Sequence, residues 1–187
     1  MSFAHLHVHT EYSLLDGSNK IKEYVKKAAD LGMTAAAITD HGVMYGVIDF
    51  YREAKAAGIN PVLGCELYVA PESRFDREPS GSSGDDRYYH LILLAENNEG
   101  YANLMKIVSI GFVDGFYYKP RVDFETLEKY HEGLICLSAC LAGEVPRLIQ
   151  RGCYDEAKAC ALKYEACFGK GNYFLEMQDH GIAAQRD

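Results

Sequence analysis

The chain has 187 residues, of which 48% are hydrophobic and 25% are charged, a balance typical of globular proteins rather than disordered or fibrous ones. No run approaches the roughly 18 apolar residues of a membrane span, so we expect no membrane partner. The N-terminus lacks the features of a secretory signal, so we expect a cytoplasmic protein. The length suits a single domain, residues 1–187. The net charge is −8 and no basic block is longer than Lys26-Lys27. Either the substrate is not a long nucleic acid, or bound cations and a neighbouring domain supply the positive charge needed to hold one.

Apolar, β-prone runs alternate with helical patterns along the chain. We expect strands at 3–9, 34–39, 61–69, 88–95, 134–138 and 173–177, and helices at 18–31, 45–57, 99–113, 126–130 and 154–168. The spacing of the first strands fits βα units of about 30 residues, which predicts a parallel sheet. A full eight-unit barrel needs about 250 residues, which leaves a smaller barrel, an open sheet or a fragment of a longer polypeptide. Residues 71–87, rich in Pro, Ser, Gly and Asp, are expected to form a mobile surface insertion.

Three histidines alternate with apolar residues in His5-Leu6-His7-Val8-His9. On a strand these histidines share one face, and His5 and His9 would lie roughly 13 Å apart, too far to share an ion. His7 and His9 can converge on one ion or on two neighbouring ions. Because sites in βα proteins gather at the carboxyl ends of strands, we expect His7 and His9 to bind metal and His5 to be a hydrogen-bonded core residue.

Polar residues also end or interrupt the next two strands. Thr39-Asp40-His41-Gly42 follows an apolar run, so His41 can bind metal while Asp40 accepts a hydrogen bond, or the four residues form an ordinary turn. Glu66 lies within an apolar strand, where an ionised carboxylate needs a compensating charge. A carboxylate that bridges two metal ions and a buried salt bridge are both open readings for Glu66.

Two further residues are candidates by position, and for a third the position argues against a place in the site. Asp16 follows the first strand by a short loop and can reach the same edge, or serve as a turn residue. Cys140 ends a strand, where a thiolate can bind zinc or a thiol can simply pack. His90 begins its strand, and in a parallel sheet that position faces away from the site.

Residues outside these strands complete the candidate set. Glu176 and His180 lie at and beyond the last strand, and they are candidates for supporting residues or further ligands. Lys119 and Arg121 lie in a Tyr- and Pro-containing loop, where they can meet a phosphate or remain solvated.

The assembled motifs resemble the polymerase-and-histidinol-phosphatase (PHP) family. They are His7-x-His9, Thr39-Asp40-His41-Gly42, Gly64-x-Glu66, His90-Leu91 and Leu137-Ser138-Ala139-Cys140. Within the family, residues 4–17, 72–77, 115–121 and 178–181 resemble the N-terminal domains of bacterial replicative DNA polymerase III alpha subunits. The likeness covers essentially the whole chain.

The resemblance implies a distorted seven-unit (βα) TIM-like barrel with up to three divalent ions, usually zinc or manganese, with magnesium as an option. The implied ligands are His7, His9, Asp16, His41, Glu66, His90 and Cys140, with Asp40 and Glu176 in outer positions. The family's last strand carries an Asn-Asp-x-His motif that has no counterpart before Asp187. We therefore expect a C-terminally truncated domain that lacks its last strand.

The function that the resemblance implies is metal-assisted hydrolysis of phosphodiesters, as a 3′–5′ proofreading exonuclease in a DNA polymerase, with Glu66 as the bridging catalytic carboxylate. The partners would be DNA, held through the full-length polymerase, and other replicase subunits. One alternative is a catalytically weak scaffold that stabilises the polymerase and docks a separate proofreading subunit. Another is a free-standing phosphatase for small phosphomonoesters, similar to histidinol phosphatase.

Overall fold

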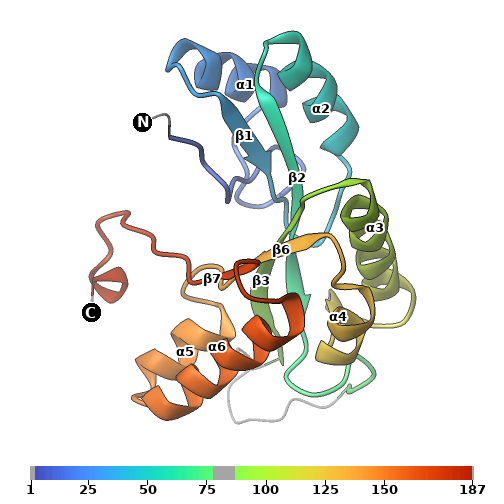
Figure 1. Ribbon diagram of the computed structural model, residues 1–187, viewed down its shortest axis with the longest axis vertical. Coiled ribbons are helices and arrows are strands. Elements are labelled where there is room, and N and C mark those ends of the chain that lie inside the picture. The colour runs from blue at the N-terminus through green and yellow to red at the C-terminus, as the bar shows by residue number, and fades with distance from the viewer. Residues whose placement is uncertain (1–2, 78–86, 187) are drawn as a thin grey trace.

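The computed structural model describes residues 3–77 and 87–186 (Figure 1). Its strands are β1 (Ala35–Ile38), β2 (Asn60–Val69), β3 (Tyr89–Ala95), β4 (Phe116–Tyr117), β5 (Lys119–Val122), β6 (Leu134–Leu137) and β7 (Tyr173–Phe174). Its α-helices are α1 (Ile21–Asp30), α2 (Val47–Ala56), α3 (Asn98–Val113), α4 (Phe124–Tyr130), α5 (Glu144–Gln150) and α6 (Tyr154–Phe168), and a 3₁₀ helix, η2 (Ala183–Gln185), follows. None of the helices in these described ranges is both long and apolar enough to cross a lipid bilayer.

The seven strands of the described residues form one mixed sheet, so the α/β class is as predicted but the expectation of a parallel sheet is wrong. The order is β4-β5-β2-β3-β6-β7, with β1 paired to the first half of β2. Strand β3 runs antiparallel to both β2 and β6, whereas the β1–β2, β2–β5 and β6–β7 pairs are parallel. A parallel return needs a crossover, usually a helix. The described parts of the β2–β3 connection contain no α-helix, and the chain turns back beside β2.

The sheet has one face toward helices and one toward the site. On β2, Cys65 and Leu67 are buried in a core that α3, α4 and α6 complete, so the intervening Glu66 points to the opposite face. Strand β3 repeats this alternation, with Leu91 and Leu93 facing the helices. The period of two residues therefore places Glu66, and His90 on β3, on the same face of the sheet.

A second core joins α1 and α2 to β1. Ile21 and Val25 recur at helical spacing on α1 and pack with Phe50 and Ile38. Helix α1 starts at Ile21, later than expected, and without a side-chain cap. Just before the helix, Asn19 Nδ2 donates a hydrogen bond to the carbonyl of His9. This hydrogen bond joins the residues just before α1 to the N-terminal segment.

Several expected elements differ from the observed ones. The N-terminal segment 3–9 forms no strand, because the hydrogen bonds that join it to the end of β1 run only between Val8 and Thr39. The last strand is limited to β7, and the chain beyond it lies with the N-terminal segment on one open side of the molecule (Figure 1). Helix α5 and the β4–β5 hairpin have no counterpart among the expected elements.

The expected insertion at 71–87 lies partly outside the described residues, which omit 78–86. Its first part is attached to the domain. Arg74 Nη1 donates to both carboxylate oxygens of Asp123, each at 2.9 Å, and Asp123 also caps α4 by accepting from the Thr126 backbone N–H.

Candidate metal centre

Strand pairing brings the candidate ligands of β1, β2 and β3 to one place. Past the end of β1, the backbone N–H of Glu66 donates to Asp40 and that of Gly42 donates to Glu66, so His41 lies beside Glu66. Because β3 is antiparallel to β2, its first residues lie at the carboxyl end of β2, and His90 is paired with Tyr68. His90 therefore faces the site. The expectation from its position alone was wrong, because that expectation assumed a parallel strand.

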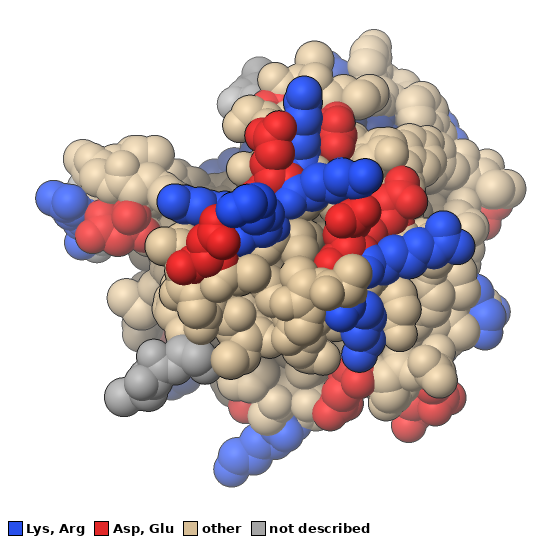
Figure 2. Space-filling model, turned by 90° about the horizontal axis from the view of Figure 1, so that it is seen from above, with Lys and Arg blue, Asp and Glu red and all other residues tan. Residues whose placement is uncertain are grey.

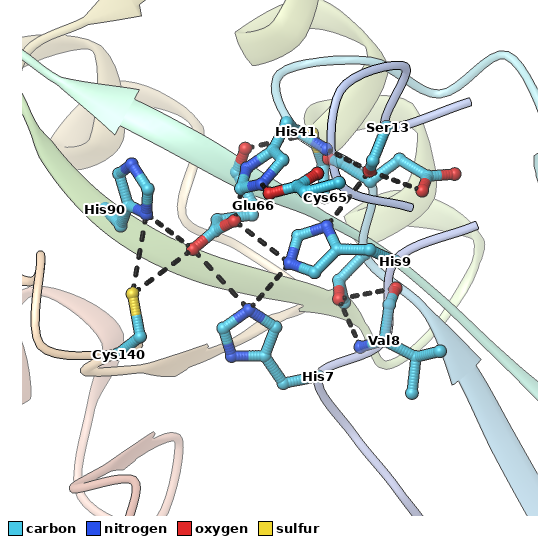
Figure 3. A network of polar contacts seen from close by, with 12 residues as sticks. His7, Val8, His9, Ser13, His41, Cys65, Glu66, His90 and Cys140 are labelled. Atoms are coloured by element: carbon cyan, nitrogen blue, oxygen red, sulfur yellow. Dashed lines mark hydrogen bonds and ion pairs between the residues drawn. The ribbon is translucent and has the colours of Figure 1, made fainter. Parts of the chain in front are cut away.

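Glu66 is the centre of the arrangement (Figure 3), with a side chain only 1% exposed. Its Oε2 lies 2.5 Å from His41 Nδ1 and 3.2 Å from His9 Nε2. Its Oε1 lies 2.8 Å from His90 Nδ1 and 3.5 Å from His7 Nε2. One buried carboxylate thus has two imidazoles at each oxygen.

Cys140 and Asp16 extend this cluster on opposite sides. Cys140 Sγ lies 3.5 Å from His90 Nδ1 and 3.8 Å from Glu66 Oε1 (Figure 3). The loop carrying Cys140 is tied to β3, because the His90 N–H donates to Ala142. Asp16 is 59% exposed, and its Oδ2 lies 2.9 Å from His41 Nε2. All seven predicted ligands therefore join one connected group.

The electrostatics of the cluster keep Glu66 ionised. Burial alone would raise the pKa of Glu66, but hydrogen bonds with His41, His7, His9 and His90 outweigh it and hold that pKa well below its usual range. Burial would lower the pKa of His7, but contacts with Glu176 and Glu66 reverse this and raise the pKa to about 9.

Two other groups in the cluster hold their protons more firmly than usual. The pKa of His41 is raised, since contacts with Glu66 and Asp16 outweigh its burial. Burial, together with the Glu66 charge, raises the pKa of the Cys140 thiol to about 11. A cation at this site therefore competes with protons for its ligands.

A buried network fixes the ring of His9. Asp40 accepts hydrogen bonds from the Thr10 N–H and from the Thr10 and Ser13 hydroxyls, at 2.6–2.7 Å. Ser13 Oγ in turn lies 3.0 Å from His9 Nδ1 and accepts from the His41 N–H at 3.1 Å. With its own proton on Asp40, the Ser13 oxygen accepts from His9 Nδ1–H, which leaves Nε2 free to bind a cation.

His7 is oriented in the same way by the segment after β7. Its Nδ1 lies 2.7 Å from Glu176 Oε1, and Gln178 Nε2 donates to that same oxygen at 2.6 Å. The Ser138 hydroxyl accepts from the Glu176 N–H at 2.8 Å and fixes this segment to β6. The Nδ1 proton of His7 is thereby directed to Glu176, and Nε2 is directed to Glu66.

The residues present fit divalent cations. The donor atoms of His7, His9 and Glu66 all lie within 4.8 Å of one another, and so do those of His41, Glu66 and His90. His41 Nδ1 and Glu66 Oε2 are buried and lie 2.5 Å apart, so a cation that replaced the proton between them would satisfy both atoms. Imidazole nitrogens, a carboxylate and a thiol form a donor set typical of zinc and neighbouring divalent metals.

Three predicted residues lie elsewhere than expected. His5 is exposed, with its ring against Phe3, so it is not the hydrogen-bonded core residue expected from the strand pattern. Arg121 is buried and donates to the carbonyls of Asp76, Arg74 and Gly115, which makes it a structural residue rather than a phosphate contact. His180 is exposed and contacts Gln185 rather than the cluster.

Lys119 lies beside the cluster. Its ammonium is 5.2 Å from the centre of the Tyr68 ring, and that ring lies 5.4 Å from the His90 ring and 6.1 Å from the His41 ring. The cluster opens into a cleft of about 1,260 Å³ between the N-terminal segment and the chain after β7.

The family assignment follows from comparison with known proteins. The model of the PHP domain matches residues 5–180. This chain belongs to the PHP domain family. The family resemblance seen in the sequence is thereby confirmed.

The curated relatives of this PHP domain are much longer proteins. It is 54% identical over 186 residues to DNA polymerase III subunit alpha of Treponema pallidum (strain Nichols), a match that covers 100% of this chain and 16% of the relative. It is 49% identical over 183 residues to the subunit of the same name from Borreliella burgdorferi, covering 98% of this chain and 16% of that one. Among solved structures, an amidohydrolase from Chromobacterium violaceum matches 56% of this chain and 32% of its own, with 24% identity and a TM-score of 0.38.

Sequence reasoning missed three residues that shape the PHP domain's site. Ser13 joins His9 to Asp40 and His41, and Gln178 holds Glu176. Tyr68 lies against His41 and His90. Tyr68 follows Glu66 by two positions on one strand, and that spacing alone would have placed it on the site face.

Proposed function

We propose that this PHP domain hydrolyses phosphodiester bonds with divalent ions bound at Glu66, acting on DNA as a 3′–5′ exonuclease. The observation that carries the proposal is the buried Glu66 carboxylate, which has a pair of imidazoles at each oxygen. A carboxylate in that position can bridge two ions, and paired ions are a common solution for phosphodiester hydrolysis.

Bound divalent ions supply an activated water and neutralise the charge that develops on the phosphate. The chain's own residues prepare the site for them. Glu66 stays ionised, Glu176 and Ser13 fix the tautomers of His7 and His9, and the Asp40 network limits their movement. The proposed role of Lys119, whose ammonium lies over the Tyr68 ring beside the cluster, is to bind a phosphate oxygen of the substrate.

The proposed ligands are His7, His9, Asp16, His41, Glu66, His90 and Cys140, and the proposed metals are zinc or manganese, with magnesium as an option. Cys140 favours zinc, because thiolates bind soft and borderline cations. The carboxylates Asp16 and Glu66 also suit manganese.

We further propose that the domain works as part of a replicative DNA polymerase, with other replicase subunits as partners. Support comes from relatives named DNA polymerase III subunit alpha, of which this chain spans 16% in the two described above. The net charge of −8 fits a domain that relies on bound cations and on the rest of a larger polypeptide to hold DNA.

A scaffold is the second candidate, and one observation favours it. Glu66 is already paired with histidines from three separate segments, so the cluster can hold the fold together whether or not hydrolysis takes place. In that case the domain stabilises the polymerase and docks a separate proofreading subunit.

Hydrolysis of 5′-labelled single-stranded DNA by the full polypeptide separates these functions. We expect degradation by the wild type and by His131→Ala, a control histidine at the end of α4, and loss of degradation with a chelator or with His9→Ala. Hydrolysis that is unchanged by both the chelator and His9→Ala contradicts the proposal. A folded wild type without nuclease activity favours the scaffold, and turnover of a simple aryl phosphate with none of DNA favours the small-molecule phosphatase.

A further inference from the structure

Tyr118 occupies an unusual position on the β4–β5 hairpin. It is the single residue between the paired Tyr117 and Lys119, and its φ of 60° lies in the left-handed region that favours glycine. Its side chain is 66% exposed. A large ring in this conformation adds strain to the hairpin and buries little surface in return, so the fold itself does not explain it.

Cationic and aromatic groups surround the exposed ring. The Arg87 guanidinium lies 4.7 Å from the centre of the Tyr118 ring, and the Tyr117 ring packs edge-on against it at 4.7 Å. Arg87 Nε is buried and has no hydrogen-bond partner among the described residues. Tyr118 is thus held in place by its neighbours while much of its surface remains open.

A row of rings and cations connects this ring to the metal centre. Lys119, next to Tyr118, lies over the Tyr68 ring, which packs against His41 and His90. Tyr88 lies 4.9 Å from Tyr68, and its ring is parallel to that of His90 at 6.1 Å. Tyr68 itself is buried, so a chain molecule leaving the centre across this edge of the sheet would meet the partly exposed Tyr88 and Lys119 and then the exposed Tyr118 ring.

We propose that Tyr118, with Arg87 and Lys119, binds the single-stranded DNA that extends from the metal centre. A base stacks on the exposed part of the Tyr118 ring, and Lys119 and Arg87 contact the backbone phosphates. This inference rests on the proposed nuclease function and adds to it the path of the substrate strand.

Single-stranded DNA fits these residues better than a duplex or a protein does. Only an unpaired strand presents base faces for stacking, and aromatic rings interleaved with cations are the usual means of binding it. A duplex needs a broader basic surface. The face over α1 and α2, for comparison, mixes acidic and basic side chains (Figure 2).

The substitution Tyr118→Gly separates binding from folding. Glycine accepts the positive φ without strain, so a Tyr118→Gly protein should melt at the same temperature as the wild type or higher. The same change removes the stacking surface, and we expect the affinity for a fluorescein-labelled dT12 in a chelator-containing buffer to fall at least about fivefold. Tyr118→Phe should keep the affinity, and so should Tyr154→Ala, which removes an exposed tyrosine on α6.

The binding assay uses the full polypeptide and is paired with photocrosslinking of a dT12 that carries 5-iodouracil. We expect a crosslink on the peptide containing Tyr118, retained in Tyr154→Ala. Unchanged dT12 affinity in Tyr118→Gly, or the absence of that crosslink, overturns the inference. Neither readout needs hydrolysis, so they test the strand path even if the nuclease assay fails. Normal hydrolysis with unaltered dT12 binding in Tyr118→Gly refutes the path and leaves the nuclease proposal intact.

Discussion

Metal binding at the centre should release protons, because a cation can bind His7 Nε2 only when that nitrogen carries no proton. Burial acts to lower the pKa of His7, but contacts with Glu176 and Glu66 raise it to about 9, so at pH 7 the imidazole of the apo protein is almost fully protonated. For each proton that the cation must displace, the apparent affinity rises about tenfold with each pH unit, until the pH reaches the pKa of the group that holds the proton. Affinity should therefore rise steeply from pH 7 to 8, and the contribution of His7 to this rise should level off above about pH 9. His41, whose pKa is also raised, adds to the effect.

The same protonation stabilises the apo fold over a defined pH range. The pKa of His7 is about 9 in the folded protein against an ordinary value of 6.5, so its contribution to stability is fully present below pH 6.5 and is lost as the pH rises through 9. A shift of this size corresponds to about 3 kcal/mol. A bound cation replaces the proton, so the metal-loaded protein should escape this loss.

Calorimetry of zinc binding to the chelator-treated protein measures the released protons directly. At pH 7 we expect the heat to depend on the ionisation enthalpy of the buffer, with at least one proton released per protein. Glu176→Gln should reduce that number, because the Glu176 carboxylate helps to hold the His7 proton. Heats that are independent of the buffer, together with an apo melting temperature that does not fall between pH 6.5 and 9, would refute the reasoning.

Two further substitutions test the residues around the centre. Asp40→Ala leaves the Thr10 N–H and the Thr10 and Ser13 hydroxyls without their buried acceptor. We therefore expect the free energy of unfolding, measured by chemical denaturation, to fall by about 3 kcal/mol or more. A smaller fall would contradict the role given to Asp40. Arg121→Met removes three carbonyl contacts, none of them with the metal centre, so it should lower the melting temperature and leave zinc affinity at the wild-type value. A weaker zinc affinity would place Arg121 in the site after all.

The sequence predicted the ligands better than it predicted the sheet that carries them. Glu66 could be found because a charged residue in an apolar strand needs a partner, and His7 and His9 because alternate residues of an extended chain share a side. The alternation holds even though segment 3–9 forms no strand, since the contacts of Val8 with Thr39 keep that segment beside β1.

The remaining features depend on long-range contacts that a local pattern does not encode. The direction of β3 follows from a connection without a described crossover helix, and that direction decides whether His90 faces the site. The roles of Ser13 and Arg121 depend on groups distant in the sequence. Short motifs gave the types of residue at the centre, and pairing between distant segments determined their positions.

Anomalous diffraction from crystals of this protein grown with zinc or manganese tests the central claim most directly. If Glu66 bridges two cations, the map at the metal edge will show peaks on both sides of its carboxylate, one near each oxygen and its imidazoles, and both will vanish in Glu66→Gln. No peak within ligand distance of Glu66, or peaks that persist unchanged in that variant, would contradict the account.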